Sequence, residues 1–259
     1  MSIIDTEEPD DLVEYQDSLD IMYQREKLSR LKKDFFTFQP SITPMMIKRL
    51  TKWFIETCAN LYIHMDTLLL AVYLLNKILS FVRVSRRNLP LLGTTILYMS
   101  DKIKEDWQDL SVGDFVKATD FLYSDEEIFN MERIVLKKLD WNINIPIPTD
   151  FITVYCTNDF GVKCFDVVVM TLFGLIIDTD IIVDYLPSTI AYSAMIVSRR
   201  MQGITPEWNE ELEQQTRYKY EDLVDCVEKL YLLYMEKSER RDIVDEYINN
   251  LILWAEPTD

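Results

Sequence analysis

Glycine and histidine are scarce in this sequence, whose 259 residues contain five glycines and one histidine. So few glycines argue against sheets joined by tight hairpins, and no glycine-rich phosphate-binding loop is present. With one histidine and four cysteines that show no CxxC spacing, the sequence offers no cluster of metal ligands. We therefore expect an all-helical protein that binds no cofactor and no metal.

Features of secreted and membrane proteins are also missing. The first twenty residues contain eight acidic side chains and no Lys or Arg, which excludes a signal peptide there. The most apolar stretch, residues 68–82, is interrupted by polar side chains and is too short to span a bilayer. We expect a soluble intracellular chain with no membrane partner and with buried, reduced thiols at Cys58, Cys156, Cys164 and Cys226.

The formal net charge of −17 opposes binding to nucleic acid over the surface as a whole. Counting side chains along the sequence gives −8 for residues 1–20, +8 for residues 25–87 and −17 for residues 88–259. Such a division is typical of solvated helix faces, although it can also steer a protein partner.

Hydrophobic periodicity and helix caps predict a series of helices in the first half of the chain. Residues 1–16 are acidic and poor in large apolar side chains, so we expect them to be disordered. Thr43 and Pro44 form an N-cap and a first-turn proline, and Asp66 is a candidate cap for the next helix. The expected helices cover residues 17–33, 44–63, 66–82, 85–104, 111–119 and 124–139. The helix at 66–82 is apolar on nearly every side and should be enclosed by the others.

The helix at residues 124–139 has the clearest start signal in the sequence. Ser124 followed by Glu127 is a capping box, in which each side chain bonds the other residue's backbone amide. A carboxylate, Glu132, lies at the rim of the apolar stripe of this helix, which consists of Ile128, Met131, Val135 and Leu139. From the pattern alone, Glu132 is an ordinary solvated boundary residue.

The helical plan recurs in the second half. Helices are expected at residues 150–156, 166–177 and 218–234, with an additional one at 243–254. Leu186-Pro187 echoes Leu89-Pro90 at an offset of 97 residues, and the helix from Tyr218 echoes the one from Tyr123 at an offset of 95. We predict two tandem five-helix domains at residues 41–144 and 145–259, preceded by a tail and an outer docking helix at residues 1–40.

Several segments in the right order and spacing resemble the cyclins, most closely those of A and B type. The likeness extends over about residues 17–235 and depends on five stretches: QPSIT at 39–43, LAVYLLNKILS at 70–80, VSRRNLPLLG at 84–93, MERIVLKKLDW at 131–141 and YLPSTIA at 185–191. This resemblance implies two copies of a five-helix cyclin fold with an extra N-terminal helix and a C-terminal helix.

The resemblance also implies a function. Cyclins have no catalytic activity of their own; they bind the catalytic subunit of a cyclin-dependent protein kinase and switch it on, which controls the cell cycle in the nucleus and cytoplasm. Lys102 and Glu132 match the family residues that hold the mobile helix and activation segment of the kinase. By the same likeness, an apolar kinase-binding surface consists of Met99, Ile103, Leu136, Trp141 and Ile143, and Tyr23 matches a kinase-contacting aromatic.

A second surface of the family docks substrate or inhibitor peptides that carry an Arg-x-Leu motif. Its pattern is matched here by Met46, Leu50, Trp53 and Glu56, with Glu56 expected to receive the basic residue of the peptide. Four positions depart from the pattern: Ile47 replaces an Arg, Arg49 an Ile, Asn76 an Asp and Pro90 a Gln. Because Arg49 should repel basic motifs, we expect weak or altered docking.

A transcription-associated adaptor built from the same paired fold is the main alternative, although adaptors that hold DNA are basic and this chain is acidic. An enzyme is disfavoured, since the sequence shows no paired nucleophile and base in a recognisable motif.

Overall fold

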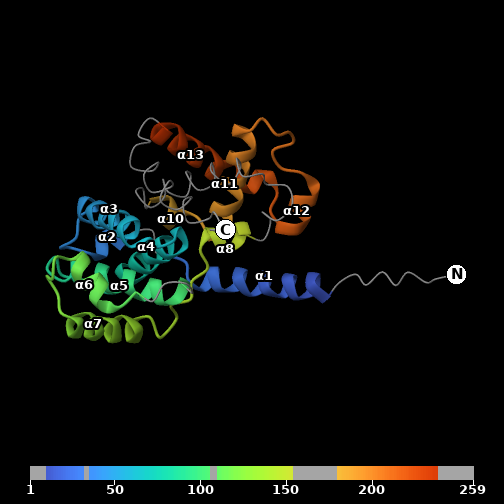
Figure 1. Cartoon of the computed structure of the whole chain (residues 1–259). Helices are drawn as coiled ribbons and strands as arrows, with labels where there is room; N and C mark the ends of the chain where they lie inside the picture. Colours follow the sequence, from blue (N-terminus) through green and yellow to red (C-terminus); the bar gives the residue numbers. More distant parts are fainter. Residues whose placement is uncertain (1–9, 32–34, 106–109, 154–179, 239–259) are drawn as a thin grey trace, which may run out of the picture.

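The computed structural model describes residues 10–31, 35–105, 110–153 and 180–238 (Figure 1). All regular elements within these residues are helices, as predicted. The predicted helices at 166–177 and 243–254 lie outside the described residues, as do Cys156 and Cys164. Cys58 and Cys226 are free and buried, as expected.

The described part of residues 41–144 contains five helices: α3 (Pro44–Leu61), α4 (Met65–Leu79), α5 (Leu89–Lys104), α6 (Val112–Ala118) and α7 (Asp125–Lys138). Every residue of α4 except Asp66 is buried. Helix α4 packs against α3 and α5, and α5 also packs against α7. The sequence prediction of an enclosed central helix is confirmed.

The helix starts agree only in part with the sequence. The capping box of α7 is present, and the Ser124 hydroxyl accepts a hydrogen bond from the Glu127 amide. The N-cap of α4 is His64 rather than Asp66, which lies in the first turn, and α5 begins at Leu89 rather than near residue 85. Asp66 was misassigned because an acidic side chain suits both the cap and the first turn of a helix.

Helices α6 and α7 end in the same uncommon way. Each is followed by two non-glycine residues in the left-handed region, Asp120 and Phe121 (φ 52° and 57°) and Asp140 and Trp141 (φ 50° and 60°). The Phe121 and Trp141 amides donate hydrogen bonds to the carbonyls of Val116 and Leu136, at 3.0 and 2.9 Å. These turns point large aromatic rings outward: Phe121 is 72% exposed and Trp141 is 70% exposed.

The described part of the second half contains α8 (Pro148–Thr153), α10 (Asp180–Asp184), α11 (Pro187–Met201), α12 (Glu210–Thr216) and α13 (Tyr220–Ser238). Helix α11 packs against α8 and α13, much as α5 packs against its neighbours in the first half. Both α5 and α11 start at the Leu-Pro pair that suggested a duplication. The short helices α10 and α12 were not predicted.

Helix α1 (Asp10–Leu28) lies beside the second half, below α8 in Figure 1, and a short helix α2 (Phe35–Phe38) follows it. The prediction of a helix at 17–33 was wrong at both ends, because α1 begins and ends earlier. The disorder expected through residue 16 was likewise wrong from Asp10 onward. Acidic composition is typical of disordered segments, yet acidic residues are also favoured in the first turn of a helix.

Two polar side chains attach α1 to the second half. The buried Glu26 carboxylate accepts hydrogen bonds from the Ser188 amide and hydroxyl, at 2.9 and 2.8 Å, in the first turn of α11. Burial raises the pKa of Glu26. The Tyr23 hydroxyl lies 2.6 Å from that of Tyr192 and donates to the Thr216 carbonyl at 2.8 Å. The outer docking helix is therefore joined to α11 and to the end of α12.

Candidate functional site

Lys102 and Glu132, which are 30 residues apart in sequence, form an ion pair between the last turn of α5 and the middle of α7. The Lys102 side chain is 41% exposed and that of Glu132 is 15% exposed. Lys102 Nζ also lies 4.4 Å from the centroid of the Tyr98 ring, a cation–π contact. Both groups are oriented by the chain itself and remain within reach of a partner.

The ring beneath Lys102 is held by further aromatic contacts. Tyr98 is buried and meets Phe115 and Phe129 edge to face, with centroids 5.4 and 6.3 Å away. Next to Lys102, the buried Asp101 has a carboxylate oxygen without a hydrogen-bond partner. Burial, and secondarily the charge of Glu105, raises the pKa of Asp101 to about 7.

Apolar side chains of α5, α7 and the turn after α7 are partly or largely exposed. Of the predicted members, Ile103, Leu136 and Ile143 are half-buried and Trp141 is exposed. Two exposed side chains of α7, Phe129 and Ile134, were not predicted. They could have been noticed in the sequence, because they are apolar residues off the buried stripe of the helix.

Two predicted members of this surface lie elsewhere. Met99 is only 2% exposed and belongs to the core, so it is not part of the exposed apolar surface. Tyr23 is half-buried between α1 and the second half, where its ring stacks on Phe151 at 5.5 Å. This internal contact could not be predicted from the sequence, because Tyr23 and Phe151 are distant along the chain.

A side chain of α4 holds the turn that carries Trp141. Lys77, a buried residue of α4, donates a hydrogen bond from Nζ to the Asn142 carbonyl at 3.2 Å. Burial lowers the pKa of Lys77. Because this contact holds the residue next to Trp141, the exposed indole extends from a fixed backbone.

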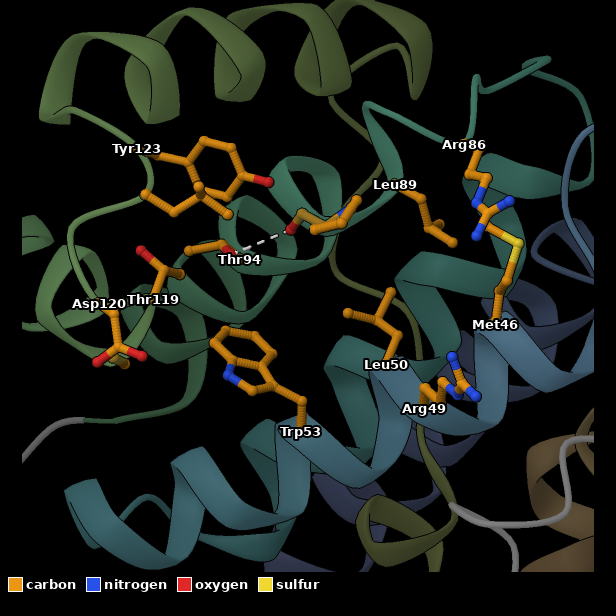
Figure 2. A pocket seen from close by; sticks show the side chains of 13 residues that line it. Met46, Arg49, Leu50, Trp53, Arg86, Leu89, Thr94, Thr119, Asp120 and Tyr123 are labelled. Carbon is orange, nitrogen blue, oxygen red and sulfur yellow. Dashed lines mark hydrogen bonds between the residues drawn. The ribbon is translucent and has the colours of Figure 1, made fainter.

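A second candidate site is a pocket of about 400 Å³ in the first half (Figure 2). Its walls come from α3, from the start of α5 and from the connection between α6 and α7. The lining residues are Met46, Arg49, Leu50, Trp53, Arg86, Leu89, Pro90, Thr94, Ala118, Thr119, Asp120, Leu122 and Tyr123. We call this pocket the α3–α5 groove.

The α3–α5 groove contains three of the four residues predicted for substrate docking, Met46, Leu50 and Trp53. Glu56 is not among the residues that line the groove. It lies one turn after Trp53 on α3 and forms an ion pair with Lys52 at 3.5 Å, and both of these side chains are exposed. The lining includes Arg49, as the sequence suggested, and also Arg86, which was not predicted.

Two of the departures from the docking pattern are buried together with the core. Ile47 and Asn76 are both inaccessible to solvent, or nearly so. The Asn76 amide donates to the Val72 carbonyl at 2.9 Å, while its own side-chain oxygen has no hydrogen-bond partner. A neutral pair avoids leaving a buried charge uncompensated, which would cost several kcal/mol.

Neither a metal site nor a membrane span is found among the residues that the structure describes. No group of three or more His, Cys, Asp or Glu side chains in these ranges could hold a metal ion. None of the described helices combines the length and apolar character needed to cross a membrane.

Comparison with protein families gives two matches along the chain. The family described as cyclin, N-terminal domain, matches residues 17–144, and the family described as cyclin, C-terminal domain, matches residues 146–248.

Individual relatives are mitotic cyclins of moderate identity. The G2/mitotic-specific cyclin S13-6 of Glycine max is 30% identical over 237 residues, covering 91% of this chain and 52% of that protein. S13-7 of the same plant is 30% identical over 197 residues, covering 76% of both. The G2/mitotic-specific cyclin-A of Patella vulgata is 27% identical over 215 residues, covering 82% and 50%. This chain thus spans about half the length of two of these relatives.

Solved structures share the fold at lower identity. A viral cyclin from herpesvirus saimiri superposes with a TM-score of 0.72 at 18% identity, covering 84% of this chain and 96% of that one. A chain of the yeast RNA Pol II CTD kinase CTDK-1 complex gives a TM-score of 0.61 at 14% identity, covering 90% and 81%. These likenesses concern the arrangement of the helices.

Proposed function

This chain belongs to the cyclin family, and we propose that it is a regulatory subunit that binds a cyclin-dependent protein kinase and switches it on. The observation that carries the proposal is the partly exposed Lys102–Glu132 pair, which joins α5 and α7. Relatives named as mitotic cyclins support a role in cell division.

The second half of the chain indicates that Glu132 is not required by the fold. At the offset of 95 residues its counterpart on α13 is Val227, which is fully buried. At the offset of 97 residues the counterpart of Lys102 is Arg199, which donates to the Pro206 carbonyl at 3.2 Å. Two helices of this fold therefore pack together without an acidic residue at this point, which favours a binding role for Glu132.

The free-energy requirement of kinase activation defines what this surface has to supply. Shifting the mobile helix of a kinase from 1% to 99% in the active position needs about 5.5 kcal/mol of differential binding. A partly exposed ion pair contributes about 1 kcal/mol or less. Burial of about 220 Å² of apolar surface would supply about 5.5 kcal/mol. Trp141 and Phe129 are exposed and available for this burial, while Lys102 and Glu132 orient the partner.

The proposal is tested by co-purifying the chain with cyclin-dependent kinases and measuring phosphorylation of a short peptide substrate. We expect the Lys102→Ala, Glu132→Ala double variant to activate the bound kinase at least tenfold less, since two charge-assisted hydrogen bonds to the partner are lost. Trp141→Ala should weaken kinase binding.

The matched control is Lys229→Ala, Asp225→Ala, which removes an exposed ion pair of 3.4 Å from α13. This control should activate the kinase like the parent chain. Equal activation by the Lys102, Glu132 double variant would contradict the assignment of the site. The nuclear and cytoplasmic location implied by the family resemblance stays a prediction, which imaging of a tagged chain would test.

A further inference from the structure

The α3–α5 groove has opposite charges at its two ends (Figure 2). Arg49 and Arg86 lie at one end, Asp120 lies at the other, and Leu50 and Trp53 line the space between them. Both arginines are exposed, and within the described part of the chain neither forms an ion pair. Guanidinium groups beside an apolar surface favour a ligand that combines an apolar side chain with a carboxylate.

In the second half, the equivalent surface on α8 and α11 is covered by α1. There, the Tyr23 ring lies between Phe151 of α8 and Tyr218, which precedes α13, at centroid distances of 5.5 and 6.4 Å. Three residues further along α1, Glu26 reaches the first turn of α11 and bonds to Ser188. The occupant of this place is thus a helix that presents an aromatic ring and a carboxylate.

The walls of the two places correspond element by element. The groove lies between α3 and α5, and α1 lies on α8 and α11, which are the first and third helices of their halves in the predicted duplication. Tyr123 in the groove corresponds to Tyr218 at the offset of 95 residues. Leu89-Pro90 at the start of α5 corresponds to Leu186-Pro187 at the offset of 97.

The start of α5 can also attract a carboxylate, although the counterpart of Ser188 at the offset of 97 residues is Leu91, which has no hydroxyl. The side chain of its N-cap residue, Asn88, makes no capping hydrogen bond. The N-terminus of a helix carries a partial positive charge, and Arg86 precedes α5 by three residues. The helix start and the two arginines lie at the same end of the groove, so all three attract an acidic side chain.

We propose that the α3–α5 groove binds an amphipathic helical segment of a partner protein in the manner in which α1 binds the second half. An aromatic side chain of the partner lies between Trp53 and Tyr123, and a glutamate three residues later lies between Arg49 and Arg86. The inference rests on the proposed function in one respect, since the docked protein would be a substrate or inhibitor of the bound kinase.

This ligand differs in charge from the Arg-x-Leu peptides that the family resemblance implied. The acidic residue expected to receive such a motif, Glu56, is outside the groove and paired with Lys52. The acidic residue within the groove, Asp120, lies at the end opposite the arginines. A basic side chain next to Arg49 would meet two like charges in place of a partner.

The test is fluorescence anisotropy with the free, full-length chain and a labelled helical peptide of about 15 residues. The probe peptide presents Tyr and Glu three positions apart, and two matched peptides carry Gln or Arg in place of Glu. We expect the Gln peptide to bind about tenfold more weakly and the Arg peptide more weakly still, because a charge-assisted contact is lost or replaced by repulsion. Added salt should reduce the difference.

Paired variants locate the effect. Arg49→Ser, Arg86→Ser should remove the preference for the Glu peptide over the Gln peptide. The control, Lys48→Ser, Arg87→Ser, makes the same change in net charge at exposed neighbours that do not line the groove, and it should keep the preference. Both double variants are at exposed positions, and circular dichroism verifies that they fold.

Three results would overturn the proposal: no binding of the Glu peptide at about 1 mM, equal or tighter binding of the Arg peptide, or an equal loss of preference in the control. Kinase activation is measured separately with the short peptide substrate. Failure of groove binding with normal activation would refute only the groove inference, and the reverse would refute only the kinase proposal.

Discussion

Each half of this protein has a surface formed by its first and third helices. In the second half α1 covers this surface, whereas in the first half the surface is open. In the second half α1 covers the start of α11, and Glu26 and Tyr23 satisfy polar groups there. In the first half the start of α5 opens into the α3–α5 groove. The same arrangement of helices therefore makes a contact within the chain in the second half and forms an open groove in the first half. The contrast identifies which residues belong to the fold and which belong to binding.

Removal of the carboxylate that joins α1 to α11 should have the largest effect on stability. Glu26→Ala leaves the buried Ser188 amide without its acceptor, so we expect unfolding free energy to fall by about 3 kcal/mol. Urea denaturation measures the change. Gln24→Ala, at an exposed position on the same helix, is the control and should change stability by less than about 0.5 kcal/mol. Similar losses in both variants would show that Glu26 has no special role.

A second difference between the halves is buried charge. Asp101 on α5 corresponds to the buried Ser198 on α11, at the offset of 97 residues. The folded state holds the Asp101 proton up to about pH 7, whereas the unfolded chain releases it near 3.8, so stability falls as pH rises between these values.

The Asp101→Ser variant lacks this dependence. Relative to the parent, its unfolding free energy should rise by about 2–4 kcal/mol between about pH 4 and pH 8; the upper value corresponds to the full difference in pKa and the lower one allows for solvent screening. Denaturation midpoints across this range measure the difference. A parallel pH dependence in parent and variant would contradict the raised pKa of Asp101.

Gly93 of α5 lies against Leu50, which lines the groove. A Cβ atom at Gly93 would lie 2.5 Å from Leu50 Cδ1, whereas the corresponding residue of α11, Ile190, is a buried side chain. Gly93→Ala should displace Leu50, lower stability by about 1–2 kcal/mol and weaken binding of the Glu peptide. Gly113→Ala is the control, because its Cβ would meet only Ser111 Oγ at 3.4 Å. The control should be neutral or slightly stabilising through helix propensity.

Loss of the Tyr23 hydroxyl should lower the unfolding free energy only slightly. Tyr23→Phe keeps the ring between Phe151 and Tyr218 but removes the hydrogen bonds to Tyr192 and Thr216. We expect a loss of about 1 kcal/mol in unfolding free energy, measured by thermal or urea denaturation. No loss would mean that the ring alone holds α1 in place.

Local features of the fold could be predicted from the sequence because their causes lie within one or two turns. The start of α7 follows from the capping box at Ser124 and Glu127. The burial of α4 follows from the apolar character of residues 68–82 on nearly every side. The Leu-Pro repeat correctly indicated a similar helix start in both halves. The resemblance of sequence segments, rather than periodicity, identified Lys102 and Glu132 as a pair.

Contacts between distant parts of the chain could not be predicted in this way. Glu26 and Ser188 are 162 residues apart, and nothing in either neighbourhood signals the other. Met99 was assigned to a surface although it is buried, because an apolar residue on a helix suits both a core and an interface. Arg86 was missed because it lies in the link before α5 and reaches the groove only in three dimensions.

The turn after α7 has a consequence for the free protein in solution. Asp140 and Trp141 both adopt a left-handed backbone, which for a large aromatic residue costs about 1 kcal/mol or more, and the indole remains largely in water. Neither folding stability nor solubility favours a tryptophan at such a position. In the free protein the Trp141 ring remains exposed to water. Burial of this ring against another molecule would gain free energy that folding of the chain alone does not provide.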